Sequence, residues 1–82
     1  MNITVYSKPD CVQCEFTKTH LGREGLPHTV IDVTADESAM AAMRLAVGEP
    51  AGPVQMPVVV VDGMEPWHGF RIDLIRALKA AA

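Results

Sequence analysis

The run of four valines at residues 58–61 most constrains the fold of this 82-residue chain. A half-exposed strand alternates apolar and polar residues, whereas an unbroken β-branched run predicts a strand that is fully buried. A chain of this length is long enough for one compact domain and too short for two. We therefore expect a single domain, residues 1–82, built around this central strand.

Periodicity and stop residues predict three further strands and three helices. The strands are expected at residues 2–6, 28–33 and 64–67, and the helices at residues 12–24, 38–47 and 71–80. Gly25 ends the first helix, Thr34 and Glu37 predict a capping box for the second, and Asp62-Gly63 predicts a hairpin. A strand–helix–strand unit makes parallel neighbours and a hairpin adds antiparallel ones. The predicted fold class is α/β, in the order βαβαββα around a four-stranded mixed sheet.

Composition and charge exclude several classes of function. Hydrophobic residues make up 49% and charged residues 21%, as in globular proteins, and the net charge of −3 includes no basic stripe for nucleic acid. No apolar stretch reaches the roughly 18 residues that a membrane span needs. The start, MNITVYSKPD, shows no secretory signal, so we expect a cytoplasmic monomer. Core positions expected on the helices are Phe16, Met40, Met43, Leu74, Ile75 and Leu78, and His20 is expected on an exposed face.

Cys11 and Cys14 are the only cysteines, and they permit a staple, a metal site or a redox couple. A permanent staple does not persist in a reducing compartment, and closing so short a loop removes little chain entropy. Structural zinc takes four ligands, usually as two close pairs. The histidines His20, His28 and His68 lie in three separate segments, so no metal is expected. A cysteine pair that opens the first helix of a βαβ unit indicates a thioredoxin-like redox motif.

The spacing of the two cysteines suits disulfide exchange. Residues three apart share a helix face, so Cys11 and Cys14 can form a disulfide without unwinding the helix. Cys11 lies among the unpaired N–H groups of the helix start, where the helix dipole also favours a thiolate. We therefore expect Cys11 to attack a partner disulfide and Cys14 to resolve the mixed disulfide. Lys8 adds positive potential nearby, unless it is an ordinary surface lysine.

Met56-Pro57 precedes the valine strand and forms the second element of the site. Proline cannot donate a hydrogen bond to a sheet, so it belongs at the first position of the strand or at a bend. There it leaves the backbone groups of Met56 free to pair with an extended peptide. The alternative is a loop proline that contacts no substrate.

Three segments, CVQC, QMPVVVV and WHGFRIDLI, together resemble the NrdH-redoxins, glutaredoxin-sized proteins of the thioredoxin fold. The similarity extends along nearly the whole chain. It implies four strands, three helices and a cis peptide bond before Pro57. It also implies a dithiol that donates electrons to the large subunit of class Ib ribonucleotide reductase and receives them from NADPH through thioredoxin reductase. No bound cofactor is implied beyond the redox-active disulfide Cys11–Cys14.

The chain departs from this family at two positions. The family commonly has WSGFRP, whereas this chain has WHGFRI, so His68 replaces a serine and Ile72 a proline. Trp67 and Phe70 either close the end of the core or cover the cysteines and meet the reductase, and the resemblance favours the second alternative. The residues expected to contact partners are Lys8, Met56, Pro57, Trp67, His68, Phe70 and Arg71.

Two other functions are compatible with these residues. The first is a glutathione-dependent glutaredoxin, in which Arg71 binds a carboxylate of the peptide. The second is a redox-silent module that binds a metal or serves as an adaptor. Replacing both cysteines by serine would leave such an adaptor functional but would inactivate an electron carrier.

Overall fold

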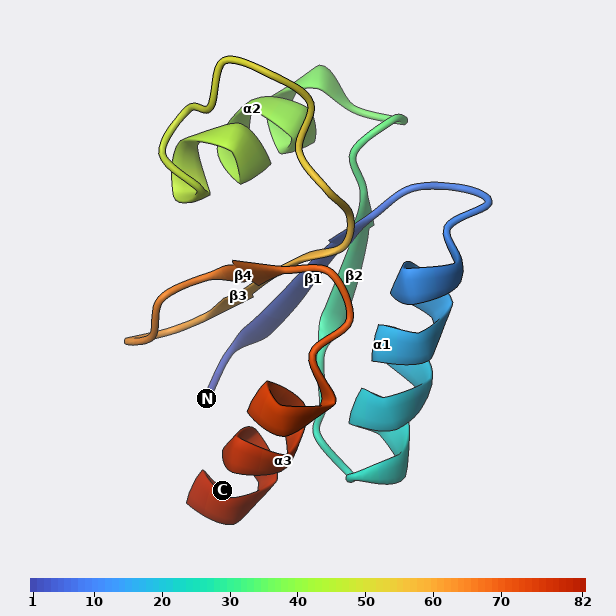
Figure 1. Ribbon diagram of the computed structural model, residues 1–82, viewed down its shortest axis with the longest axis vertical. Helices are drawn as coiled ribbons and strands as arrows, with labels where there is room; N and C mark the ends of the chain where they lie inside the picture. Colours follow the sequence, from blue (N-terminus) through green and yellow to red (C-terminus); the bar gives the residue numbers. More distant parts are fainter.

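The valine run forms the central strand β3, Val58–Val61, in the computed structural model, which describes all 82 residues (Figure 1). Val59 and Val61 pack into a core on one face of the sheet, and Val58 packs into a core on the other. Val60 is half-buried against the second core. Both faces of β3 are therefore covered, which explains why its sequence does not alternate.

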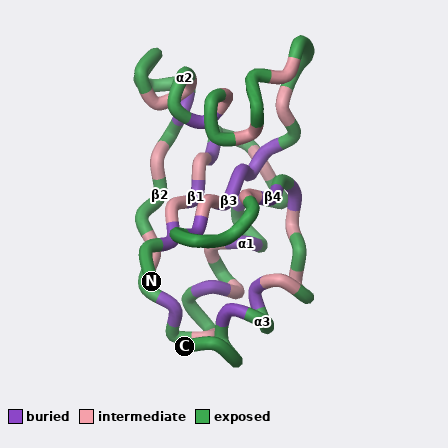
Figure 2. The backbone as a smooth tube through the Cα atoms, turned by 90° about the vertical axis from the view of Figure 1, so that its left-hand side faces the viewer, coloured by how far each residue is buried: buried purple, intermediate pink, exposed green.

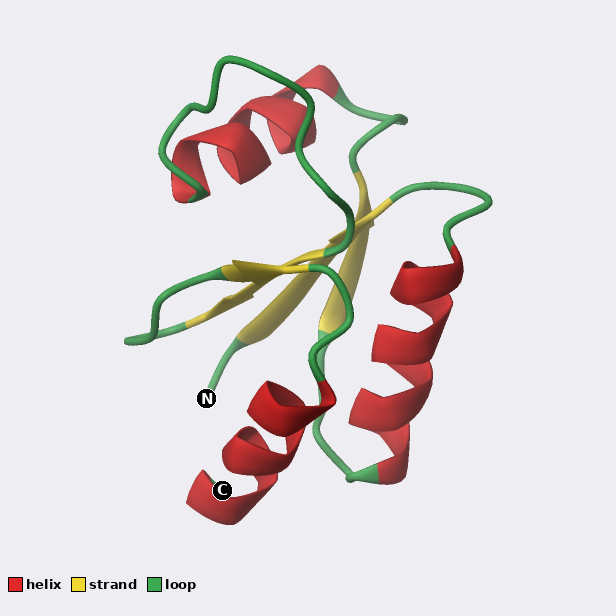
Figure 3. Ribbon diagram, in the orientation of Figure 1, coloured by secondary structure: helices red, strands yellow, loops and turns green.

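Three more strands and three helices surround β3 (Figure 3). The strands are β1 Ile3–Ser7, β2 Thr29–Asp32 and β4 Trp67–His68, and the helices are α1 Val12–Arg23, α2 Glu37–Ala46 and α3 Ile72–Ala81. The sheet has the order β2-β1-β3-β4, with β1 parallel to β2, β1 antiparallel to β3 and β3 antiparallel to β4. This arrangement confirms the α/β class, the element order and the mixed sheet.

The helices form one layer on each face of the sheet. Helices α1 and α3 lie together on one face, and α2 lies on the other (Figure 1). The buried parts of the backbone run through the sheet and the inner sides of the helices (Figure 2). The core beneath α1 and α3 contains Ile3, Val5, Leu21, Leu26, Val59, Val61, Trp67, Ile75 and Leu78. The core beneath α2 contains Cys14, Val33, Met43, Met56 and Val58. None of the three helices has the length and apolar character needed to cross a membrane.

Most of the core predicted on the helices is confirmed, but Phe16 is not part of it. Ile75, Leu78 and Met43 are buried, whereas 51% of Phe16 is exposed. The buried residues of α1 are Cys14, Thr17 and Leu21, spaced three and four apart along one helix face. Phe16 lies beside this face, so it packs on a neighbouring loop and not in the core.

The fourth strand begins later than residues 64–67, the range expected from the Asp62-Gly63 turn. The turn forms, with the Met64 N–H donating to the Val61 carbonyl at 3.1 Å. The connection nevertheless extends through Pro66, and pairing resumes only where Trp67 lies opposite Val59. Proline has no N–H to donate to a neighbouring strand, so β4 starts after it.

Helix α2 has a different cap from the one predicted. Asp36 is the N-cap, and its carboxylate accepts the Ser38 N–H at 2.8 Å. Thr34 lies two residues earlier, in the turn after β2, where its N–H and hydroxyl donate to Asp32. The predicted capping box of Thr34 and Glu37 is therefore wrong. Glu37 is instead the first residue of the helix, where its negative charge interacts favourably with the positive end of the helix dipole.

Replacing Asp36 tests this cap and its dependence on pH. Hydrogen bonds from Ser38, first from its hydroxyl and then from its N–H, lower the pKa of Asp36. A group with a lowered folded pKa stabilises the fold above its unfolded pKa, and that contribution is lost as the pH falls through the folded value. We expect Asp36→Ala to lower the melting temperature at neutral pH, and we expect the deficit to shrink as the pH falls below the ordinary pKa of aspartate, about 3.9.

Asp36→Asn is the matched control, because asparagine caps helices as well as aspartate but does not titrate. It should melt close to the wild type at neutral pH. If Asp36→Ala and Asp36→Asn melted at the same temperature there, the cap assignment would be wrong.

Candidate active site

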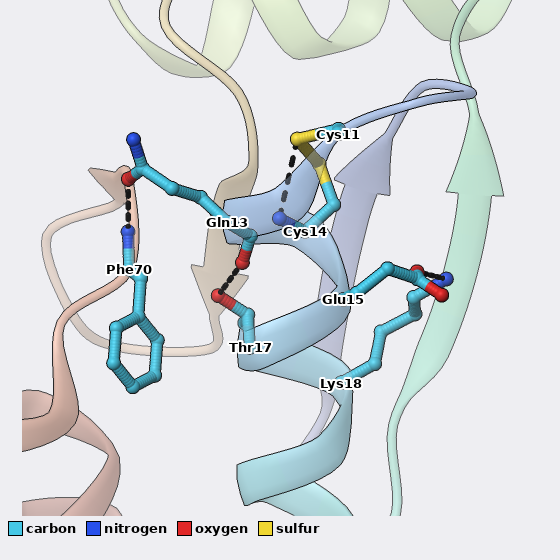
Figure 4. Close-up of a disulfide and its surroundings, with 7 residues drawn as sticks. All are labelled: Cys11, Gln13, Cys14, Glu15, Thr17, Lys18 and Phe70. Atoms are coloured by element: carbon cyan, nitrogen blue, oxygen red, sulfur yellow. Dashed lines mark hydrogen bonds and ion pairs between the residues drawn. A yellow bond between two sulfur atoms is a disulfide. The ribbon is translucent and has the colours of Figure 1, made fainter.

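The two cysteines lie at the start of α1, immediately after the tight turn that leaves β1 (Figure 4). Asp10 takes a left-handed conformation with φ 57°, and Cys11 follows as the N-cap with φ −114° and ψ 105°. The chain thereby turns sharply into the helix. Cys11 and Cys14 form a disulfide across one helical turn, with their Cα atoms 5.2 Å apart.

The environments of the two sulfurs differ. Cys14 is fully buried in the core beneath α2, whereas Cys11 is half-buried and lines the surface. The Cys14 N–H donates to the Cys11 sulfur at 3.2 Å. This bond and the positive end of the helix dipole both stabilise negative charge on Cys11 once the disulfide opens. The less buried sulfur, that of Cys11, is therefore also the one at which a thiolate is favoured.

A shallow groove of about 310 Å³ passes over Cys11. Its walls are the segment Lys8, Asp10, Cys11, Val12 and Gln13 and the segment Val54, Gln55 and Met56. The peptide bond between Met56 and Pro57 is cis, which confirms the expectation from the family resemblance. Neither the N–H nor the C=O of Met56 hydrogen-bonds within the chain. Both groups therefore have no hydrogen-bond partner in the chain, at the wall of the groove that passes over Cys11.

A third segment, residues 68–70, is hydrogen-bonded to both walls of this groove. The Gly69 N–H donates to the Pro57 carbonyl at 2.9 Å. The Phe70 N–H donates to the side-chain oxygen of Gln13 at 2.8 Å (Figure 4). Sequence reasoning missed Gln13, because its partner lies 57 residues away and no local pattern identifies it.

Trp67 and Phe70 have separate environments. Trp67 is only 6% exposed and belongs to the core beneath α1 and α3, so of its two alternatives the structure shows core packing. Its indole Nε1 is buried and donates to no group of the chain. Phe70 is half-buried, and its ring centroid lies 5.7 Å from that of Phe16 and 5.1 Å from that of His20. His20 is therefore half-buried and not on an open helix face.

Of the remaining predicted contact residues, only Lys8 lines the groove with Cys11. Lys8 is exposed, forms no ion pair and lines the groove with Cys11. His68 is exposed and lines a separate hollow of about 610 Å³ against the loop that follows α2. Arg71 pairs with Asp73 through two hydrogen bonds, of 3.1 and 2.8 Å. The hydrogen bond from Arg71 lowers the pKa of Asp73.

No group of three or more histidine, cysteine, aspartate or glutamate side chains is placed to hold a metal ion. The site joins a half-buried and a fully buried cysteine in one disulfide at a helix start, beside a groove of about 310 Å³.

Comparisons with known proteins match this arrangement. The glutaredoxin family model matches residues 3–65. The glutaredoxin-like protein NrdH of Escherichia coli K12 is 37% identical over 81 residues, which cover 99% of this chain and 93% of that protein. The chain belongs to the glutaredoxin family. Within this family it is similar to the NrdH-redoxins along its whole length.

Further relatives agree with this assignment. The Gene 56 protein of mycobacteriophage L5 is 33% identical over 93% of this chain and 70% of that protein. The solved structure of NrdH-redoxin from Escherichia coli superposes with a TM-score of 0.80, covering 95% of each chain. This glutaredoxin-family protein therefore has the thioredoxin fold, and it is a thiol–disulfide oxidoreductase with its redox pair at Cys11 and Cys14.

Two glycines with the same backbone conformation test how tightly the groove is assembled. Gly69 and Gly63 both have φ +78°. A Cβ at Gly63 meets nothing within 4 Å, whereas a Cβ at Gly69 lies 3.1 Å from the Gln13 side-chain oxygen and 3.3 Å from the Gln55 nitrogen. Each alanine variant should lose about 1–2 kcal/mol from left-handed strain, as measured by urea denaturation.

Only Gly69→Ala should also slow the reduction of a protein disulfide, because its Cβ displaces the side chains of Gln13 and Gln55. Gly63→Ala is the control for backbone strain alone. Equal activities of the two variants would show that the 68–70 segment does not shape the groove.

Proposed function

We propose that this protein donates electrons to the large subunit of class Ib ribonucleotide reductase and is itself reduced by thioredoxin reductase with NADPH. The observation that carries the proposal is the match to NrdH along the whole chain. The solved NrdH-redoxin of Escherichia coli is described as having a thioredoxin-like activity profile. The proposal places the protein in the cytoplasm as a monomer.

Cys11 is assigned as the nucleophile and Cys14 as the resolving thiol. The Cys11 thiolate attacks one sulfur of the partner disulfide, forming a mixed disulfide and releasing the other partner sulfur as a thiolate, which takes up a proton. Cys14 then loses its proton and attacks the Cys11 sulfur. The partner leaves as a dithiol, and the disulfide Cys11–Cys14 remains. Two electrons have passed from the protein to the partner.

The partner is assigned to the groove over Cys11. Its extended chain pairs with the free backbone groups of Met56, which Pro57 holds in place, and Lys8 contacts it from the opposite wall. Val12 is 67% exposed next to Cys11 and adds apolar surface. Phe70, whose ring packs against Phe16 and His20, adds aromatic surface, and apolar and aromatic residues suit the centre of a protein interface. Trp67 supports the 68–70 segment from the core, and His68 and Arg71 border it.

Glutathione is the alternative electron donor, and two features of the site disfavour it. A glutathione carboxylate needs backbone donors and a free cation. The Phe70 N–H is occupied by Gln13, and Asp73 takes two of the five N–H donors of Arg71. A glutathione carboxylate at the Phe70 N–H requires the Gln13 bond to break, and one at Arg71 shares the guanidinium with Asp73, which leaves Lys8 as the unpaired cation beside Cys11.

Trapping experiments test the division of labour between the thiols. Cys14→Ser should accumulate a mixed disulfide with an oxidised protein substrate, because the resolving thiol is absent. Cys11→Ser should form no adduct, because Cys14 is fully buried. Non-reducing electrophoresis and mass spectrometry measure the adduct. Equal trapping by the two variants would contradict the assignment.

The electron donor is tested by NADPH consumption with a disulfide substrate. We expect rapid consumption when the protein is mixed with thioredoxin reductase and slow consumption with glutathione and glutathione reductase. A Cys11→Ser variant supplies the background rate in both mixtures. Rapid consumption only in the glutathione mixture would refute the proposal and make the protein a glutathione-dependent glutaredoxin.

A further inference from the structure

The two walls of the groove over Cys11 belong to segments far apart in the chain. Cys11, Val12 and Gln13 form one wall, and Val54, Gln55 and Met56 form the other. A peptide that pairs with Met56 presents its disulfide to Cys11 only if the distance between the walls is fixed. Cys11 and Cys14 pack with Met56 in the core beneath α2, and hydrogen bonds add a second connection between the two walls.

Gln13 makes the only hydrogen bond from the segment 11–14 to a distant part of the chain. The other bonds of this segment stay within the first turns of α1. They join Cys14 N–H to Cys11 Sγ at 3.2 Å, Glu15 N–H to Cys11 C=O at 3.1 Å and Thr17 Oγ1 to Gln13 C=O at 2.8 Å, besides the regular bonds of the helix. The side-chain oxygen of Gln13 instead accepts the Phe70 N–H at 2.8 Å (Figure 4).

This bond continues directly to the opposite wall. Gly69 precedes Phe70, and its N–H donates to the Pro57 carbonyl at 2.9 Å, next to the free groups of Met56. Gly69 has no side chain, and a Cβ there would come within 3.1 Å of Gln13 and 3.3 Å of Gln55. The two glutamine side chains thus pack over Gly69 from opposite walls. Two consecutive N–H groups bridge the cysteine turn and the Met56-Pro57 segment.

We propose that Gln13 is a positioning residue for disulfide reduction by this protein. It acts through Phe70, Gly69 and Pro57 to keep the wall formed by Val54, Gln55 and Met56 at a fixed position relative to Cys11. Gln13 contacts no reacting sulfur. The inference rests on the thiol–disulfide activity alone and not on the identity of the electron donor or acceptor. It applies to protein substrates, which occupy both walls, and not to small disulfides, which need only Cys11.

Two substitutions of nearly equal length separate the hydrogen bond from the bulk of the side chain. Gln13→Met keeps the length but removes the acceptor, whereas Gln13→Glu keeps an oxygen that accepts the Phe70 N–H. Thr19→Met is the control for an added methionine on the exposed part of α1. Each variant is tested on insulin with dithiothreitol as the reductant, and, after reduction and removal of dithiothreitol, on the small disulfide 5,5′-dithiobis(2-nitrobenzoate) with the reduced protein itself as the only thiol.

We expect Gln13→Met to raise KM for insulin about 3- to 10-fold with little change in kcat, the effect of losing one hydrogen bond that aids binding. Its rate with the small disulfide should stay at the wild-type value. Gln13→Glu should restore KM for insulin. Its added carboxylate should also move the pH profile of the rate upward, because negative charge near Cys11 raises the pKa of the thiol. Thr19→Met should match the wild type with both substrates.

Amide hydrogen exchange at Phe70 tests the bond itself in the reduced and oxidised protein. The Phe70 N–H should be protected in both states of the wild type and of Gln13→Glu, and should exchange faster in Gln13→Met. An unchanged KM for insulin in Gln13→Met would overturn the proposal. An equal loss of rate with insulin and with the small disulfide would also overturn it, because that result places the effect on Cys11 itself.

Discussion

The antiparallel pairing of the buried strand β3 with both of its neighbours brings the site together. Tyr6 at the end of β1 and His68 at the end of β4 both lie opposite Val58, the first residue of β3. The loop after β1, the loop before β3 and the loop after β4 therefore meet at one edge of the sheet (Figure 3). These loops carry the cysteines, the cis proline and the Gly69-Phe70 pair. Because β3 is covered on both faces, a hydrophobic core holds this central strand from each side.

The parts of the site that depend on local sequence were predictable. A cysteine pair at a helix start requires only a strand, a turn and a helix in succession, and Met56-Pro57 is recognisable because proline precedes an apolar run. The parts that depend on distant contacts were not. Gln13 gains its role from an N–H 57 residues away, and Phe16 is exposed because Cys14, Thr17 and Leu21 define the buried face of α1. Two element boundaries were predicted wrongly because a neighbouring residue decides them. Pro66 delays the start of β4, and Asp36 caps α2 in place of Thr34.

The difference between the two sulfurs follows from where α1 meets the sheet. The N-cap of α1, Cys11, lies at the edge of the sheet where the loops meet. Cys14 reaches the core beneath α2, beside Met43 and Met56. Burial in an apolar core disfavours a thiolate, and a helix N-terminus favours one. One helical turn thus separates a sulfur suited to attack a partner from a sulfur suited to remain a thiol until the mixed disulfide has formed. The asymmetry requires no charged residue in contact with either sulfur.

The second wall of the groove is held by hydrogen bonds on both sides of it in the sequence. Arg44 of α2 donates to the carbonyls of Pro50 and Gly52, the latter at 3.2 Å, and so ties the long loop to the helix. At the other end, Gly69 holds the Pro57 carbonyl. The segment Val54–Met56 therefore lies between two hydrogen-bonded anchors. For the partner proposed above, this arrangement puts less of the ordering cost of binding on this wall of the groove than on the partner segment.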